Sequence, residues 1–533
     1  MPTLALPPTR RRHGHCRTAG LVRGSALLAA FGLASCWAWA EGDAIDTATG
    51  PSLKSNWHIV PSLALEGTNT DNVNLTAAKT SAFITRISPG LRIDGAGART
   101  SGSLDYQWQS YSYSDNSTRN NLQRSLAAQG KAELIENWLF LDGSHNTSQQ
   151  TVSAFGTQSV GNELTNRNRA ESASYMLAPH IQGVLGGVVE YQLRYSGSTT
   201  RSDSGALSGG ATTTRSTTGR LAGATPLAVL GWSVDAAQQV IASFTGPESR
   251  SQSATGTLTF QLDPQFRFLA TAGSESDNFT SAVTQKTNSN AFGVDWAPTE
   301  RTKLSLKKDK HTFGNGFLAD FTHRTELSAW QFSDSRSVRT PAPQASLVRT
   351  GSIYDLFYQQ LTSSVPDPTA RAAATRQSLA QAGLSPDAPV FGQIQTSQAF
   401  VERRQQASLA LMGANNTVTF VADRSISNQL SKRVGVVDDF SLSSEIRQSG
   451  FNTSWAHKLS PYSSLTLNAQ TSRSSGSGSL ATSLRALSLQ LTTQIGASTS
   501  ASVALRKNNF TGSGGTSSSY DERALVCAVT FRF

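Results

Sequence analysis

Apolar and polar residues alternate one by one along many short stretches of this chain, and this period of two constrains the fold more than any other feature. Near the C-terminus, the stretch 487–491 alternates Leu with Ser and Gln, and the stretch 501–506 continues the pattern. Residues 104–108, 191–195 and 303–307 show similar runs. Such alternation predicts β-strands that have one apolar and one polar face. The chain is therefore predicted to be all-β.

Composition excludes several other classes of protein. Only 15% of the 533 residues are charged, and the mean hydropathy is -0.29. The charged fraction is too low for a coiled coil, and three cysteines are too few for a disulfide scaffold. Beyond the first forty residues, no apolar stretch reaches the length of about 18 residues that a transmembrane helix needs. A soluble β-sandwich and a membrane β-barrel remain, because both use strands with one apolar face.

The first forty residues have the features of a signal peptide. Basic residues precede the apolar stretch 24–35, and Ala38-Trp39-Ala40 forms a small-x-small cleavage site. We therefore expect a signal peptide at 1–40, a short periplasmic segment at 41–56 and a barrel at 57–533. A twin-arginine export signal is an alternative, as is lipoprotein processing at Cys36.

Removal of this segment changes both the charge and the cysteine count. The formal net charge falls from +10 to +5, so the mature chain is only mildly basic. Cys527 becomes the single cysteine, which excludes an intramolecular disulfide in the oxidising periplasm. The expected location is the outer membrane of a Gram-negative cell.

The connections between the predicted strands alternate between short and long. This asymmetry is typical of outer-membrane barrels, which have tight periplasmic turns and longer external loops. Ten tight turns with both termini in the periplasm predict about 22 strands, within a range of 18 to 22. The predicted turns are Gly95 to Gly102, Glu136-Asn137, Pro179-His180, Thr225-Pro226, Asp263-Pro264, Ala297-Pro298, His323-Arg324, Gly413 to Asn416, Ser460-Pro461 and Gly496-Ala497.

The last strand carries a further signal of a barrel. Apolar residues alternate through it, and the sequence given stops on Phe533. Leu525, Val529, Phe531 and Phe533 resemble the β-signal that the barrel-assembly machinery reads. An ordinary terminal strand of a secreted sandwich is the alternative.

One long connection, at 338–396, interrupts the strand pattern. Ser352 is placed to cap a first helix, and Asp367-Pro368 to cap and begin a second that runs to Gly383. We expect a helical insertion on the side of the external loops. It could constrict the mouth of a pore or be an external decoration.

Alternation also assigns the charged residues of the strands to a face. With apolar positions toward lipid, several basic residues face the lumen, where they meet fewer acids such as Asp105, Glu190 and Asp295. Two interpretations stay open: a basic path for an anionic solute, or salt bridges along the wall that neutralise the lumen. The candidate basic residues of the lumen are Arg86, Arg92, Arg194, Arg267, Lys303, Lys307, Arg506 and Arg532.

Short motifs add a family resemblance. Thr70-Asp71-Asn72, Ser88-Pro89-Gly90-Leu91, Asp105-Tyr106 and the helix start Asp367-Pro368-x-x-Arg371 resemble the outer-membrane β-barrel family associated with PEP-CTERM/exosortase systems. The resemblance extends from about Trp57 to Phe533. It implies a barrel encoded with exopolysaccharide biosynthesis and export machinery, and it supplies no catalytic residues.

The predicted function is that of a channel or assembly factor for exopolysaccharide export or for PEP-CTERM protein surface systems. The alternatives are an electrically silent scaffold of a secretion complex and a general porin. A siderophore receptor is disfavoured because its plug domain would need more room than the segment before Trp57 offers, and an autotransporter because strands fill the mature chain.

The remaining expectations concern chemistry and partners. No enzyme motif is present, so we expect no enzyme, no cofactor and no metal. His180 and His323, which fall at predicted turns, are expected to be solvated or interfacial. The expected partners are outer-membrane lipid and the barrel-assembly machinery, with an acidic exopolysaccharide as a candidate and no nucleic acid.

Overall fold

A computed structural model describes residues 56–203, 211–227, 229–243, 248–281, 283–340, 396, 398–430, 438–514 and 517–533, together with residues 358, 371 and 375. The predicted signal peptide lies outside the described residues. The described residues belong to one compact unit, Lys54–Phe533.

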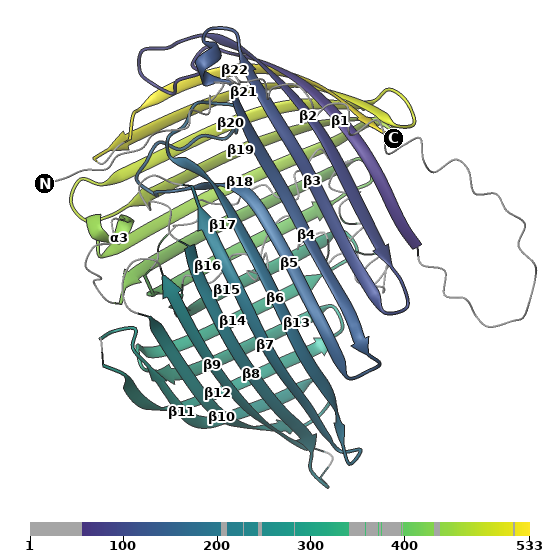
Figure 1. Cartoon of the computed structure of the whole chain (residues 1–533), viewed down its shortest axis with the longest axis vertical. Helices are drawn as coiled ribbons and strands as arrows, with labels where there is room; N and C mark the ends of the chain where they lie inside the picture. The colour runs from purple at the N-terminus through teal and green to yellow at the C-terminus, as the bar shows by residue number, and fades with distance from the viewer. Residues whose placement is uncertain are drawn as a thin grey trace, which may run out of the picture. The chain divides into compact units, whose positions relative to one another are not determined.

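The chain forms a single antiparallel sheet of 22 strands, which confirms the predicted fold class and the upper end of the predicted strand number. Each strand pairs with its neighbours in sequence, and β1 pairs with β22, so the sheet closes into a barrel (Figure 1). The strands are β1 (Asn56–Thr70), β2 (Ala82–Ala96), β3 (Thr100–Tyr113), β4 (Asn121–Ile135), β5 (Leu139–Thr151), β6 (Arg169–Leu185), β7 (Val189–Ser202), β8 (Ala211–Ala224), β9 (Leu230–Ser243), β10 (Ser249–Gln261), β11 (Phe266–Asp277), β12 (Gln285–Thr299), β13 (Thr302–His311), β14 (Gly314–Arg324), β15 (Ser328–Arg339), β16 (Phe400–Met412), β17 (Asn416–Gln429), β18 (Glu445–Ser460), β19 (Ser463–Ser475), β20 (Ala481–Gln494), β21 (Thr499–Ser513) and β22 (Tyr520–Arg532).

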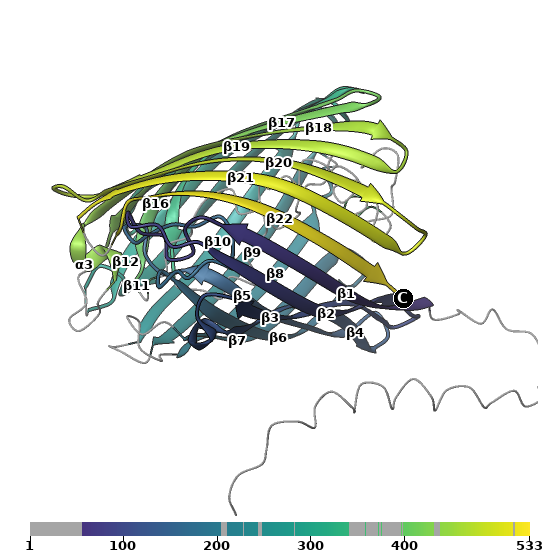
Figure 2. The same cartoon turned by 90° about the horizontal axis from the view of Figure 1, so that it is seen from above.

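The closing seam runs without interruption from Ser62 opposite Arg532 to Thr70 opposite Ala524. The backbone N–H of Phe533 extends this seam by donating to the carbonyl of Pro61 at 2.9 Å. Figure 2 shows the C-terminus beside the start of β1, at the end of the barrel where the connections are short. Closure leaves the sheet without an exposed edge, which a sheet of this size would otherwise present to other chains.

The two ends of the barrel differ in their connections. The end with short connections, called the turn end below, carries nine of the ten predicted turns within about three residues of their predicted positions. The opposite end, called the loop end, carries longer connections that include residues 340–399. One connection at the loop end is short, since only Thr312 and Phe313 separate β13 from β14.

The prediction of a turn at Pro179-His180 is wrong. Both residues lie within β6, and the turn follows at Gly186 and Gly187, whose φ angles of 57° and 75° suit glycine. Pro179 fits within β6 because the pairing of β6 with β7 has a gap at this residue. The pairing of β6 with β5 on the other side is continuous. A proline costs a strand one ladder bond on one side only.

The expected helical insertion lies mostly outside the described residues. At Tyr358, Arg371 and Thr375 the chain is helical, and the guanidinium of Arg371 lies 4.9 Å from the centre of the Tyr358 ring. The structure also contains a short 3-10 helix, η1 (Ser117–Arg119), and a short helix, α3 (Asp439–Leu442), at the loop end. Among the described helices, none has the length and apolar character needed to cross a membrane.

The two faces of the wall differ in their side chains. Large apolar residues are exposed on one face, as are Leu487 on β20, Leu505 on β21 and Leu525 on β22, which are 48%, 57% and 42% exposed. Residues at alternate positions point to the other side, and we call these two faces outward and inward.

Candidate functional site: the inward face and the loop-end mouth

All eight candidate basic residues alternate with outward-facing apolar neighbours, so they lie on the inward face of their strands. Six of them form ion pairs with acidic residues. The pairs are Arg86 with Glu66, Arg92 with Asp94, Arg194 with Asp142, Arg267 with Asp295, Lys307 with Asp309, and Arg506 with Glu163 and Glu522. Within the described part of the chain, Lys303 and Arg532 make no ion pair.

This pairing favours the second of the two interpretations of the lumen. A carboxylate within about 4 Å cancels most of the field that a guanidinium exerts on a passing ion. The inward wall of the described strands is therefore polar and largely neutralised, instead of forming a continuous basic path.

His180 differs from its expectation as an interfacial residue. It faces inward on β6, is 5% exposed and stacks on Phe140 with ring centres 5.2 Å apart. Its Nδ1 lies 3.6 Å from a carboxylate oxygen of Asp142 and 3.3 Å from Nη1 of Arg194. His180 thus belongs to an inward polar cluster, because the turn that was expected at this position lies further along the chain.

The most buried charges surround Arg506 on β21. Its Nη1 lies 2.7 Å from Oε1 of Glu163, and its Nη2 lies 2.8 Å from Oε1 of Glu522. Asn508 and Thr70 donate to the carboxylate of Glu522 at 2.8 and 3.1 Å. The side chains of Arg506, Glu163 and Glu522 are 11%, 9% and 0% exposed. Hydrogen bonds and opposite charges thus compensate the burial of three ionised groups.

Glu163 belongs to the connection between β5 and β6, residues 152–168, which we call the mouth loop. Tyr113 donates its hydroxyl to the Glu163 carbonyl at 2.6 Å. The Thr165 N–H donates to the carbonyl of Val73 at 3.1 Å. This part of the mouth loop is thereby fixed against the β1–β2 connection, β3 and β21.

The other half of the mouth loop reaches strands that lie far away in sequence. The Ala154 N–H donates to Oδ2 of Asp439 in α3 at 2.7 Å, and Thr482 on β20 donates to the Ala154 carbonyl at 3.0 Å. Tyr520 on β22 donates to the carbonyl of Gln158 at 2.7 Å. The contact with Asp439 joins residues 285 positions apart. The mouth loop therefore crosses from β5 and β6 to the part of the loop end near β18–β22.

Two apolar clusters support this crossing. Phe155 of the mouth loop, which is 0% exposed, packs with Phe440 of α3 and Ile446 of β18. Leu164 packs in a second cluster with residues that include Tyr111 of β3 and Phe510 of β21. Burial of such side chains contributes about 1.5 to 3 kcal/mol each. The loop is thus held by packing as well as by hydrogen bonds.

Two acidic groups at the mouth have shifted pKa values. Burial disfavours the charge of Glu163, but the Arg506 guanidinium outweighs it and places the pKa of Glu163 below its ordinary value. Burial raises the pKa of Asp439, even though Ser153 and the Ala154 N–H donate to its carboxylate. Glu163 is consequently the anionic anchor of the mouth loop at neutral pH.

The end of the long connection between β15 and β16 is also anchored at the loop end. Thr396 donates to Asp438 at 2.6 Å, and Gln398 donates to both oxygens of the same carboxylate at 3.1 Å. Asp438 also caps α3 by accepting the Ser441 N–H at 3.2 Å. One carboxylate thus ties the start of β16 to α3.

Sequence reasoning missed the acidic half of this site. Glu66 and Glu522 lie at inward positions, and the alternation of apolar and polar residues is the signal that identifies them. Glu163 lies in a loop without periodicity, and nothing local in the sequence indicates its contact with Arg506. In the described part of the chain, no group of three or more His, Cys, Asp or Glu residues is arranged to hold a metal ion.

No family model and no curated protein matches this chain. Among solved structures, the apoprotein form of the FrpB iron transporter from Neisseria meningitidis (F5-1 variant) matches with a TM-score of 0.50 at 10% identity, over 90% of this chain and 82% of that chain. The FrpB F5-1 variant also matches with a TM-score of 0.49 at 10% identity, over 90% and 83% of the two chains. The siderophore receptor PirA from Pseudomonas aeruginosa matches with a TM-score of 0.38 at 10% identity, over 89% and 80%. The first likeness shows that this chain has the fold of an outer-membrane β-barrel.

Proposed function

We propose that this chain is an outer-membrane channel that passes a large polar solute, and that the mouth loop controls access to its lumen. The observation that carries the proposal is the combination of a closed barrel of 22 strands with a loop that crosses its mouth. A barrel with this many strands is wide enough for a lumen that needs an internal closure. A transporter fits this arrangement better than an enzyme.

The proposed solute is an exopolysaccharide, and the proposed setting is a PEP-CTERM/exosortase system. Support comes from the family resemblance of the sequence and from the polar inward wall, where ion pairs and hydroxyl groups offer hydrogen bonds to sugars. Because six of the eight basic residues are paired, the proposed lumen accepts neutral and acidic chains alike. The proposed location is the outer membrane of a Gram-negative cell, reached by the signal peptide, and assembly requires the barrel-assembly machinery.

A scaffold without transport activity is the second candidate. The neutralised wall and the anchored mouth loop favour it, because both would also be found in a barrel that is permanently closed. Conductance distinguishes the two, since a scaffold is silent whether or not the mouth loop is anchored.

The test is conductance of the purified full chain in planar bilayers, for the wild type and for Gly476→Val. A Cβ at Gly476 would lie 2.7 Å from the ring of Phe155 and 2.9 Å from the side chain of Ser443. A larger side chain there therefore pushes Phe155 of the mouth loop away from the segment between α3 and β18, and neither contact involves an ion pair. We expect small or intermittent currents in the wild type and larger, steadier currents in the variant. An acidic oligosaccharide added on one side should block these currents transiently.

The matched control is Gly130→Val, because Gly130 lies within β4 and its nearest contact to an added Cβ is 3.8 Å away. Heat-modifiable migration on a gel verifies that each variant is a folded barrel. If the wild type and Gly476→Val are both folded and both silent, the channel proposal is wrong and the scaffold is favoured.

A further inference from the structure

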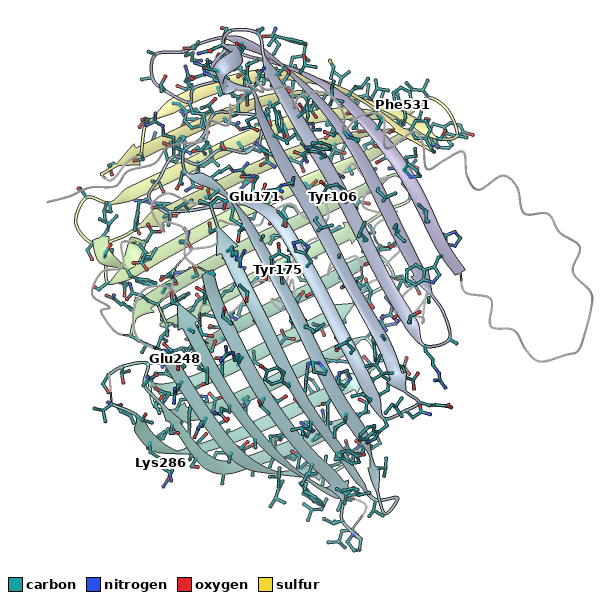
Figure 3. The ribbon with its side chains drawn as sticks, viewed as in Figure 1. Tyr106, Glu171, Tyr175, Glu248, Lys286 and Phe531 are labelled. Carbon is teal, nitrogen blue, oxygen red and sulfur yellow. The ribbon has the colours of Figure 1, made fainter. Side chains whose placement is uncertain are left out.

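Basic residues on the outward face of the barrel are confined to one half of its height. Every outward-facing Lys or Arg on the described strands lies in the half nearer the loop end, as do Arg215 on β8, Lys286 on β12 and Lys310 on β13. Figure 3 shows Lys286 and Glu248 at the loop end, away from Phe531 near the turn end. The outward face of the other half carries no Lys or Arg on any described strand.

One group of these outward basic residues lies on β17–β21 and is called the basic patch. It consists of Arg424, Arg473, Arg485 and Lys507, all of which are exposed. Ser449 of β18 pairs with Arg424 on one side and with Arg473 on the other, so these two arginines lie on one row across three strands. Neighbouring strands are about 4.8 Å apart, which places the two Cα atoms about 10 Å apart.

The other two members continue this arrangement along the wall. Arg485 lies opposite Thr471, two residues along β19 from Arg473. Lys507 lies opposite Leu487, two residues along β20 from Arg485. Within the described part of the chain, none of the four makes an ion pair, whereas the inward basic residues mostly do. Four positive groups within reach of each other thus lack acidic partners.

Below the basic patch, toward the turn end, the same face is apolar. Lys507 is next to Leu487, and the following row across β20, β21 and β22 is Leu489, Leu505 and Leu525. These leucines are between 39% and 57% exposed. The surface is therefore amphipathic along the barrel axis, with basic groups directly adjoining an apolar band.

Physical chemistry restricts the ligand that fits such a surface. A charge on the lipid face costs about 2 to 4 kcal/mol at the middle of a membrane and little near its surface, so the patch lies at headgroup level. Arginine forks bind phosphate oxygens in a bidentate manner, and acyl chains pack on leucine. A water-soluble partner that bound only the basic groups would leave the adjoining leucines exposed.

We propose that the basic patch binds the phosphate groups of an anionic, phosphorylated lipid in the membrane leaflet at the loop end. The acyl chains of this lipid lie along the exposed leucines of β20–β22. The inference requires the barrel to span a membrane, but it does not depend on passage of any solute.

The test measures binding of lipid A, a lipid with phosphate groups, to the full chain in mixed detergent micelles. Native mass spectrometry counts the lipid molecules bound at increasing mole fractions of lipid A. Each basic residue near an anionic surface strengthens association about fivefold. The triple variant Arg424→Gln, Arg473→Gln, Arg485→Gln should therefore bind about a hundredfold more weakly, and binding to the wild type should weaken at 1 M salt.

The matched control removes basic residues at the turn end, with Arg99→Gln and Arg301→Gln, and should bind lipid A as the wild type does. A second probe is the same lipid without phosphate groups, which should bind weakly to every variant. Inorganic phosphate at 10 mM should not displace lipid A. Equal binding by the wild type and the triple variant, equal binding of the phosphate-free lipid, or displacement by inorganic phosphate would each overturn the proposal.

Discussion

Replacement of Arg506 by methionine tests whether buried charge holds the mouth loop in place. The change removes a guanidinium that is 11% exposed and leaves the carboxylates of Glu163 and Glu522 buried without their cation. Loss of one partner of a buried ion pair costs about 3 to 5 kcal/mol. Glu163 lies in a loop and Glu522 in the wall, so the loop is the part that moves to relieve this cost.

Hydrogen exchange at the Thr165 amide reports this movement. This N–H donates to the Val73 carbonyl across the mouth, and it becomes free when the loop leaves. A cost of about 3 to 5 kcal/mol corresponds to a loss of protection of about two to four orders of magnitude at this amide. Amides in the middle of β21, such as that of Val503, should keep their protection, because the barrel itself remains folded.

Two further variants separate the charge from general damage. Arg506→Met combined with Glu163→Gln should regain part of the protection, because one buried carboxylate is removed. Arg267→Met removes an inward arginine that is 54% exposed, so its ion pair with Asp295 contributes at most about 1 kcal/mol and the Thr165 amide should be unaffected. Unchanged exchange of Thr165 in Arg506→Met would show that the ion pair does not hold the loop.

Three other outcomes follow from the described residues. Deletion of Phe533, which is 75% exposed at the end of the expected β-signal, should lower the amount of assembled barrel in the membrane, as judged by heat-modifiable migration and protease resistance, and should leave the melting temperature of the assembled barrel nearly unchanged. The wild type should be weakly anion-selective because most inward charges are paired, and Lys303→Glu with Lys307→Glu should shift the reversal potential in a salt gradient toward cations; a potential that does not move would place these lysines away from the ion path. The contribution of the Glu163 carboxylate is complete above the ordinary glutamate pKa of about 4.3 and is lost as the pH falls through its lower folded pKa, so conductance should rise below about pH 4; a pH-independent current would contradict this anchor.

The period of two carried the correct prediction of the fold class, because it identified the strands. It also places all eight candidate basic residues on one face of their strands, because successive side chains of a strand point to opposite sides. The same rule identifies Glu66 and Glu522, which share that face with Arg86 and Arg506. Ion pairs between neighbouring strands are therefore predictable in principle once the register is known.

The errors arose where local signals compete with the ladder. Pro179 favours a turn because proline lacks an N–H, but one missing bond is less costly than a broken strand. The true turn was indicated by Gly186-Gly187, which tolerates positive φ. The path of the mouth loop was not predictable, because it depends on contacts such as that between Ala154 and Asp439, which lie 285 residues apart.

The charges on the two faces obey different rules, and the outward charges distinguish the two ends of the barrel. Inward charges face a polar lumen at any height, so they occur along the whole wall, and most are balanced by acids on the same strand, on nearby strands or in the mouth loop. An outward charge is tolerated only at headgroup level, where it can meet a lipid of opposite sign. Outward basic residues occur on the described strands only toward the loop end, which is also the end with the longer connections. Loop length and outward charge are independent features of the sequence, and both distinguish the loop end of the barrel from the turn end.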